Sequence, residues 1–183
     1  MNPSAPPVSI ERVLESDLPV IRALAQRIWR LSYPGMISVG QIEYMLDWMY
    51  SIERLREDLR SGVVFEWPRV AETPVGYLAT RIDAESGVLH LHKLYVLPEF
   101  QGKGVGSRLL EHVLRSAGSA GCGSIRLNVN KSNARAIACY LRHGFVRETS
   151  VVHDIGGGYV MDDHVMVRPL GAGQGPPRNQ RAS

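Results

Sequence analysis

Hydrophobic and polar residues follow two different periods along the chain, and the two periods separate predicted strands from predicted helices. A period of two predicts a strand, because successive side chains of a strand point to opposite faces of a sheet. By this criterion strands cover residues 8–14, 63–70, 75–82, 88–97, 125–129, 146–154 and 159–167. Apolar residues spaced by three and four predict helices that begin near positions 17, 38, 52, 104 and 134.

Capping residues and glycines mark where these elements begin and end. Ser16 and Asp17 offer an N-cap to the first helix, and Gly144 is placed to end the last helix in a left-handed conformation. Three glycines at 156–158 predict a closing hairpin. The resulting order is β-αα-βββ-α-β-α-ββ. It predicts an α/β fold with a mixed, mostly antiparallel sheet and helices on both faces.

Length and composition predict one folded domain. The chain has 183 residues, of which 44% are hydrophobic and 21% charged, so disorder, collagen and coiled coil are excluded as descriptions of the whole. The boundaries expected are a flexible leader at 1–7, a domain at 8–170 and a Gly- and Pro-rich flexible tail at 171–183. No signal peptide or apolar run of about 18 residues is apparent, and Cys122 and Cys139 form no CxxC pair. We therefore expect a cytoplasmic protein with reduced thiols.

The net charge of +3 is unevenly distributed. Residues 99–144 hold seven basic and two acidic residues, whereas residues 1–98 hold ten basic and twelve acidic ones. Such a local positive field indicates an anionic ligand, although a solvated surface explains many such asymmetries. Nucleic acid is the rival partner, but no aromatic stacking pattern accompanies these cations.

A glycine-rich turn at 101–106, Gln-Gly-Lys-Gly-Val-Gly, lies between a predicted strand and a predicted helix. Glycines there let a ligand approach the backbone, and the N-terminus of the following helix favours phosphate. Ser107 stands where a dinucleotide-binding G-x-G-x-x-G would need its last glycine, and the spacing of a P-loop is absent as well.

A second motif, at 133–145, follows about thirty residues later. Together the two motifs resemble the signature of the GNAT superfamily of acyl-CoA-dependent N-acyltransferases, Q/R-x-x-G-x-G/A followed by N-x-x-A-x-x-x-Y-x-x-x-G-F. The residues that match are Gln101, Gly104, Gly106, Asn133, Ala136, Tyr140, Gly144 and Phe145. The order of the predicted elements also agrees over residues 8–170. The resemblance therefore implies a GNAT fold and an N-acetyltransferase domain.

The resemblance implies a binding site for acetyl-CoA, with no metal. Backbone N–H groups of residues 101–107 would hold the pyrophosphate, and Leu94 and Val96 would pair with the pantetheine arm as an added strand. Val96 N–H would polarise the thioester carbonyl. The cofactor-binding residues implied are Leu94, Tyr95, Val96, Gln101, Gly102, Lys103, Gly104, Val105, Gly106, Ser107, Asn128, Asn133, Ala136 and Tyr140.

Candidate catalytic residues are Tyr140, His90 and His92. The resemblance places Tyr140 near the sulfur as general acid, and the alternative is an aromatic residue that covers the core. The two histidines lie on one strand and are expected to share a face with Leu94 and Val96. His90-Leu91-His92 resembles the His-x-His pair of the arylalkylamine branch, which relays protons from the amine. The alternatives are hydrogen-bonded core histidines or half of a metal site.

The sequence says less about the residues that would bind the amine acceptor. In this family the first helices would cover the acceptor, including Trp29, Tyr33, Met45, Trp48 and Met49, although such residues are more often core. Two carboxylates in the segment 159–164 and Glu72 are further candidates to attract a cationic amine, with solvated acids as the alternative. The two carboxylates are Asp162 and Asp163.

We therefore expect an N-acetyltransferase that moves an acetyl group from acetyl-CoA to a primary amine of a small molecule or peptide, by direct attack in a ternary complex. The alternatives are a non-catalytic acyl-CoA sensor and, less economically, a nucleic-acid-binding protein. We expect no membrane partner and no nucleic acid, and a homodimer is compatible with the resemblance. The sequence does not identify the acceptor, the length of the acyl chain, the base or the oligomeric state.

Overall fold

The computed structural model describes residues 7–171. The expected leader and tail fall almost entirely outside these residues. Within them the elements follow the expected order, with one added strand. The strands are β1 (Ser9–Arg12), β2 (Val64–Val70), β3 (Thr73–Pro74), β4 (Gly76–Asp83), β5 (Val88–Val96), β6 (Ser124–Asn130), β7 (Val146–Gly156) and β8 (Tyr159–Pro169). The helices are α1 (Leu18–Ser32), α2 (Val39–Tyr50), α3 (Ile52–Arg60), α4 (Val105–Ser119) and α5 (Ala134–Arg142), with short 3₁₀ turns η1 (Glu15–Asp17) and η2 (Pro98–Phe100).

The addition is the two-residue strand β3, whereas α3 is the helix expected near residue 52, which the expected order did not count separately. Ser51 caps α3, since its hydroxyl accepts from the N–H of Arg54 at 3.2 Å, and Ser38 caps α2 in the same way. The expected cap of α1 is different. The carboxylate of Asp17 accepts from the N–H of Leu14 at 2.8 Å and so fixes η1, while no side chain caps α1.

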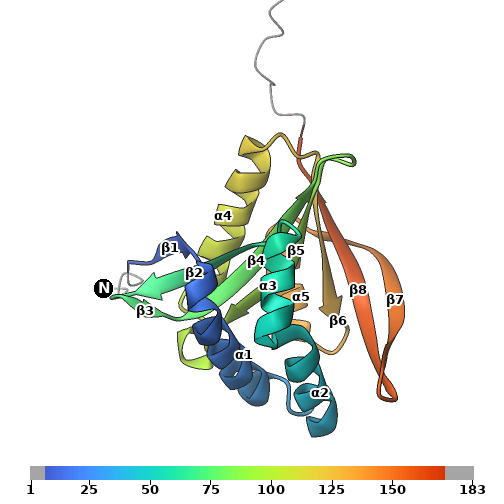
Figure 1. Ribbon diagram of the computed structural model, residues 1–183. Helices are drawn as coiled ribbons and strands as arrows, with labels where there is room; N and C mark the ends of the chain where they lie inside the picture. The colour runs from blue at the N-terminus through green and yellow to red at the C-terminus, as the bar shows by residue number, and fades with distance from the viewer. Residues whose placement is uncertain (1–6, 172–183) are drawn as a thin grey trace, which may run out of the picture.

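One mixed sheet forms the centre of the molecule, in the strand order β1-β2-β4-β5-β6-β8-β7, with β3 paired to β2. All pairs are antiparallel except β5 with β6. Figure 1 shows α1, α2 and α3 on one face of this sheet and α4 and α5 on the other. The expectation of a mixed, mostly antiparallel sheet with helices on both faces is therefore confirmed.

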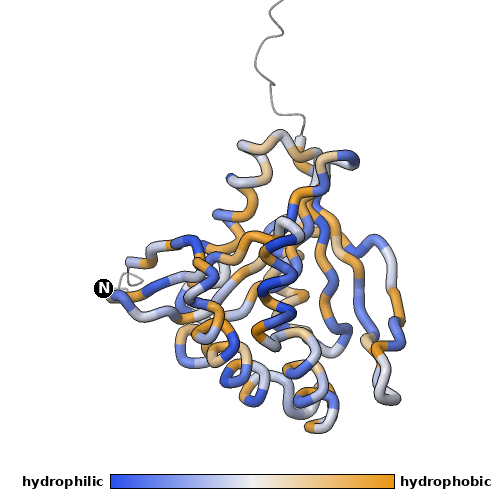
Figure 2. Tube along the Cα trace, viewed as in Figure 1, coloured by the Kyte–Doolittle hydropathy of each residue, from blue (hydrophilic) through white to orange (hydrophobic). Residues whose placement is uncertain are grey.

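Each face of the sheet has its own hydrophobic core. The first, which we call the α1–α3 core, contains Ile21, Ile42, Leu55 and Phe65; the second, the α4–α5 core, contains residues such as Leu109. Figure 2 shows hydrophobic and hydrophilic stretches alternating along the helices, as expected where one side of a helix packs on a sheet. Within residues 7–171 no helix is long and apolar enough to cross a membrane.

Strands β5 and β6 separate half-way along their length. They pair only from Val88–Ser124 to Leu91–Leu127, so the remaining part of β5 has β4 on one side and no strand on the other. The parallel pair therefore opens into a gap in the middle of the sheet. This gap positions the site described below.

A β-bulge occurs in β5 where the gap begins. Ala79 pairs with Lys93 and Thr80 pairs with Leu91, which leaves His92 as the extra residue. The bulge reverses the alternation of faces: Leu89 and Leu91 pack in the α4–α5 core, whereas Tyr95 packs against the α1–α3 core. Leu94 and Val96 pack on the α4–α5 side. His90, between Leu89 and Leu91, points to the opposite side, and His92 stacks on it. The expectation that both histidines share a face with Leu94 and Val96 was therefore wrong.

Candidate active site

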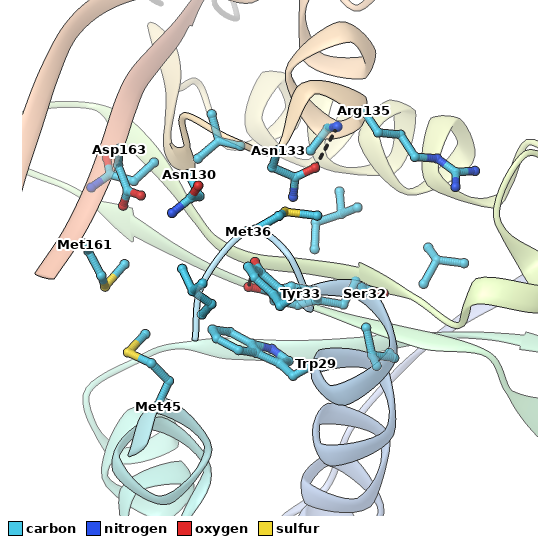
Figure 3. A pocket seen from close by; sticks show the side chains of 18 of the residues that line it. Trp29, Ser32, Tyr33, Met36, Met45, Asn130, Asn133, Arg135, Met161 and Asp163 are labelled. Carbon is cyan, nitrogen blue, oxygen red and sulfur yellow. Dashed lines mark hydrogen bonds between the residues drawn. The ribbon is translucent and has the colours of Figure 1, made fainter. Parts of the chain in front are cut away.

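A cavity of about 510 Å³ lies at the gap between β5 and β6. Its walls come from α1, α2, β5, β6, α5 and β8, which are far apart in the sequence. Figure 3 shows Asp163, Asn130 and Met161 at one end of the view and Arg135 at the other, with Trp29 and Tyr33 between them. The cavity therefore has two chemically different ends, which we call the Arg135 end and the Asp163 end.

The glycine-rich turn adjoins the Arg135 end. Gly102 and Gly104 adopt φ of +77° and +82°, values at which a Cβ atom is strained, so the turn requires glycine there. The first hydrogen bond of α4 runs from Arg108 N–H to the Gly104 carbonyl at 3.1 Å, so the N–H groups of the preceding residues are not used within the helix. The Arg135 guanidinium lies 3.7 Å from the position of a Cβ atom added to Gly102. Exposed N–H groups and a guanidinium together suit phosphate.

The open edge of β5 directs backbone groups into the gap. Leu97 N–H donates to the Val75 carbonyl at 2.8 Å, which makes this a hydrogen-bonded pair between the segments of β4 and β5. Because such pairs alternate with non-bonded ones in an antiparallel ladder, Leu94 and Val96 turn their N–H and carbonyl groups away from β4. The Val96 carbonyl accepts from Gln101 Nε2 at 2.8 Å, which ties the turn to the strand. Val96 N–H and both groups of Leu94 therefore face the gap.

The opposite wall of the Arg135 end is formed by β6 and the start of α5. Asn128, Asn133 and Ala136 all line the cavity. Asn133 also caps α5, because its side-chain oxygen accepts from Ala136 N–H at 3.1 Å. This bond holds the Asn133 amide in place and leaves its NH₂ group to the cavity side.

Tyr140 lies in the last turn of α5 and lines the cavity. It is 8% exposed, and its ring packs edge-to-face on Phe145, with centroids 5.6 Å apart. Burial raises the pKa of the Tyr140 phenol well above its usual value. The phenol is therefore protonated at neutral pH and can donate a hydrogen bond to a negative charge that forms beside it.

The two histidines occupy different positions although their rings stack at a centroid distance of 6.0 Å. His92, at the bulge, lines the cavity, whereas His90 does not. His92 is an exposed residue of β5, but partial desolvation and the neighbouring Lys93 ammonium lower its pKa, to about 4. His92 is therefore neutral at physiological pH and able to accept a proton.

A buried ion pair lies directly beside His92. Lys93 is 7% exposed, and its Nζ is 3.5 Å from Asp58 Oδ2, while Arg54 Nε is 3.2 Å from the other oxygen of Asp58. Burial lowers the pKa of Lys93, and the Asp58 carboxylate opposes that shift. The pair fixes the residue after the bulge and so holds the bulge in place.

Aromatic and methionine side chains line the middle of the cavity and its Asp163 end (Figure 3). Trp29 and Tyr33 stack at 4.4 Å, and the Tyr33 hydroxyl is 3.2 Å from that of Tyr95. The methionines that line the cavity are Met36, Met45, Met49 and Met161. Trp48, which was expected here, is 47% exposed and does not line the cavity. The remaining residues expected on this side are thus both core and cavity wall.

The three carboxylates considered for this side are separated by the structure. Asp163 is 2% exposed and lines the cavity, whereas Asp162 is half-exposed and pairs with Lys131. Glu72 is almost fully exposed and pairs with Arg69 at 3.4 Å, away from the cavity. The alternation of side chains along β8 explains why neighbouring aspartates have opposite surroundings.

The hairpin of β7 and β8 is held against α2, which closes the Asp163 end. Gln41 Nε2 donates to the Val160 carbonyl and the Tyr44 hydroxyl to the Ile155 carbonyl, both at 2.6 Å. The rings of Tyr44 and Tyr159 lie 5.3 Å apart. Asp163 is the fifth residue of β8, and its position is therefore fixed by the pairing of β8 within the sheet and by the contacts of the hairpin with α2.

The structure brings most of the expected site residues to one cavity and leaves some outside it. Cavity-lining residues among those expected are His92, Leu94, Tyr95, Val96, Gln101, Asn128, Asn133, Ala136 and Tyr140. The glycine-rich turn beyond Gln101 borders the cavity without lining it. Sequence reasoning missed Arg135, Asn130, Cys139, Met36 and Met161. For Arg135 and Cys139, their places within the 133–145 motif were the available signal. Cys122 and Cys139 are both free.

Within residues 7–171 no three histidine, cysteine or carboxylate side chains approach one another closely enough to hold a metal ion. The site instead consists of a backbone edge in a sheet gap, a glycine turn at a helix N-terminus and a buried phenol. Together the fold and site define the class of acyl-CoA-dependent acyltransferases.

Comparison with known proteins gives the family. The Acetyltransferase (GNAT) family matches residues 23–145, and the chain belongs to that family. It is 30% identical over 158 residues to an uncharacterised N-acetyltransferase of Mycobacterium tuberculosis, covering 85% of this chain and 99% of the relative. It is 28% identical over 146 residues to the spermidine N(1)-acetyltransferase of Thermoplasma acidophilum, covering 75% of this chain and 88% of the relative.

A solved structure agrees with these relatives. The PaiA N-acetyltransferase of Thermoplasma acidophilum in complex with coenzyme A superposes with a TM-score of 0.76 at 26% identity, covering 90% of this chain and 99% of that one. The protein is thus an acetyltransferase with the GNAT fold, and the expectations of family, fold and enzyme class are confirmed.

Proposed function

We propose that the protein transfers an acetyl group from acetyl-CoA to a primary amine at the gap between β5 and β6, by direct attack within a ternary complex. The observation that carries this proposal is that the unpaired edge of β5 and the buried phenol of Tyr140 line the same cavity. The relatives support the reaction type, since they include proteins named for acetylating spermidine and peptidyl-lysine.

Coenzyme A fits the Arg135 end by chemistry. Its pyrophosphate would meet the N–H groups of residues 102–107 and the Arg135 guanidinium. Its pantetheine amides would pair with Leu94 and Val96, whose backbone groups face the gap, and with the free NH₂ of Asn133. When bound, acetyl-CoA supplies an acyl group activated as a thioester.

The chain's own groups would then handle charge and protons. Val96 N–H would donate to the thioester oxygen as negative charge develops on it. The amine nitrogen would form its bond to the acyl carbon while the bond from that carbon to sulfur breaks. Tyr140 would stabilise the leaving thiolate through a hydrogen bond from its phenol. The raised pKa of the phenol lies above the ~8.5 of the parent thiol, so the sulfur leaves as a thiolate and takes its proton from solvent.

His92 would take the proton that the attacking amine must lose, directly or through water. An alkylamine with a pKa of about 10.4 is mostly protonated at neutral pH, so an acceptor that is itself neutral is needed. His92 is uncharged at this pH because its pKa lies at about 4, but so low a pKa makes it a weak base, so it would pass the proton on to water rather than keep it. His90 would act only through His92, since it does not line the cavity.

Free-thiol release from acetyl-CoA at pH 8, measured against a panel of amines and peptides, tests this function. We expect amine-dependent release and intersecting initial-velocity lines when both substrates are varied. Parallel lines would contradict direct attack. Coenzyme A binding without amine-dependent release for any acceptor would favour the non-catalytic acyl-CoA sensor instead.

A further inference from the structure

The charges that line the cavity are segregated. Among the described residues of its wall, Asp163 is the one carboxylate and Arg135 is the one lysine or arginine. Figure 3 shows the two side chains at opposite ends of the view, and Arg135 lies beside Gly102 of the turn. The cation is therefore placed toward the phosphate end and the carboxylate toward the acceptor end.

Asp163 is an unusual residue to bury. It is 2% exposed and lines the cavity, and none of the hydrogen bonds and ion pairs found within residues 7–171 involves its carboxylate. Burial and the neighbouring Asp162 raise the pKa of Asp163 above its ordinary value, whereas the charges of His153 and Lys131 oppose the shift. A buried, unpaired carboxylate that lines a cavity is costly to the fold, and a cationic ligand removes that cost.

We infer that Asp163 binds a second, non-reacting ammonium group of the acceptor, so that the acceptor is an aliphatic diamine or polyamine. This inference rests on the proposed function. A carboxylate stabilises the charged form of the amine that it contacts, and the attacking amine must be uncharged. The ammonium on Asp163 is therefore a different group from the amine that meets His92 and Tyr140.

The rest of the Asp163 end fits the carbon chain between two such amines. Met45 and Met161 lie on this side of the cavity in Figure 3, with Met36 nearer its middle. Met161 precedes Asp163 by two residues and so lies on the same face of β8. Methionine side chains adapt to a flexible aliphatic chain. The wall at this end holds no lysine or arginine among the described residues, so an acceptor carboxylate would meet only Asp163 and be repelled.

Three acceptors of matched chain length isolate the second charge: 1,4-diaminobutane, butylamine and 4-aminobutanoate. With the wild-type protein at pH 8 we expect kcat/KM to fall in that order, with a preference for the diamine over butylamine on the order of 30-fold, the size of one charge-assisted bond. In Asp163→Asn that preference falls to within about threefold, through a higher KM for the diamine, while butylamine is unaffected.

Asp162→Asn is the matched control, because it removes a neighbouring aspartate of the same strand that pairs outward with Lys131. It should keep the wild-type preference. A wild-type protein that does not discriminate between diamine and butylamine would overturn the inference. So would an Asp163→Asn variant that loses kcat equally for both amines, because Asp163 would then act on the attacking amine.

Calorimetry separates this inference from the proposed function. Titration of 1,4-diaminobutane into the protein saturated with coenzyme A should show binding that Asp163→Asn weakens about 30-fold and Asp162→Asn does not. If no amine is acetylated but this pattern of binding is found, the proposed function fails and the Asp163 subsite stands. Absence of diamine binding to the wild-type complex contradicts the subsite.

Discussion

The two ends of the cavity differ in the groups that form them: backbone groups at one end and side chains at the other. The Arg135 end is made largely of backbone groups: the N–H groups around Gly104, the open edge of β5 at Val96 and the capped start of α5. The Asp163 end is made of side chains from α1, α2 and β8, among them Trp29 and Asp163. A backbone site suits a ligand that is the same throughout a family, whereas a side-chain site can differ from member to member.

The two ends should therefore also differ in which substitutions disrupt binding there. A backbone site depends on conformation, so its weak points are positions such as Gly104 where φ is positive. A side-chain site depends on charge and shape, so single isosteric substitutions can change which acceptor binds without disturbing the fold. The predictions below probe one end at a time.

The largest effect is expected at Tyr140, which lines the cavity. Tyr140→Phe removes the hydrogen-bond donor and keeps the ring that packs on Phe145. We expect kcat to fall by about 100-fold or more, the effect of losing one preorganised hydrogen bond to a developing charge, with the KM for acetyl-CoA changed less than about threefold. Tyr33→Phe is the control, because it removes another tyrosine hydroxyl of the same cavity, 3.2 Å from that of Tyr95. An equal loss in both variants would exclude a specific role of Tyr140.

The two histidines test whether the bulge selects the base. His92→Gln should lower kcat on the order of 10-fold or more, whereas His90→Gln should change it less than about threefold, because only His92 lines the cavity. Steady-state kinetics at pH 8 measure both. A greater loss in His90→Gln would mean that the proton leaves through His90 rather than through His92.

The pKa of His92 also has a consequence for stability. It is about 4 in the folded protein, whereas an unfolded histidine has about 6.5. As the pH falls through this window the unfolded chain takes up a proton that folded His92 does not, so the wild-type protein loses stability. His92→Gln should lose less between pH 6.5 and 4 when thermal unfolding is followed by circular dichroism, and an identical pH dependence would contradict the assigned pKa.

The glycine turn is expected to show a smaller effect, confined to the Arg135 end. Gly104→Ala places a Cβ atom at φ +82°, at a cost of about 1–2 kcal/mol, and should lower Tm by roughly 2–8 °C. It should also weaken coenzyme A binding about 10-fold in a calorimetric titration, while the ratio of diamine to butylamine activity is unchanged. Gly118→Ala is the control, since this glycine of α4 has open space around an added Cβ atom and should raise Tm slightly.

The smallest effect is a gain in stability at the Asp163 end. Because burial raises the pKa of Asp163, its charged form destabilises the folded state above that pKa. Asp163→Asn should therefore raise Tm by a few degrees at pH 8, and the difference should vanish near pH 3, where the wild-type aspartate is protonated in both states. A lower Tm at pH 8 would show that the carboxylate contributes to folding rather than to binding.

The same contrast explains what the sequence could predict. The Arg135 end is formed by two short sequence motifs, 101–106 and 133–145. Their glycines and cap residues are recognised from neighbouring residues alone, so Gly104, Asn133 and Tyr140 could be predicted from the sequence. The bulge at His92 depends on how β4 and β5 pair, and the period of the side chains gives no sign of it. The difference between Asp162 and Asp163 likewise depends on which face of β8 meets α1 and α2, a property of the assembled sheet.

A crystal structure of the protein with coenzyme A tests the central claim most directly. The account predicts the pantetheine arm in the gap between β5 and β6, with its amides paired to Leu94 and Val96 and its thiol within about 3.5 Å of the Tyr140 hydroxyl. The pyrophosphate should lie on the N–H groups of residues 102–107. Coenzyme A bound outside the gap, or with its thiol turned away from Tyr140, would contradict it.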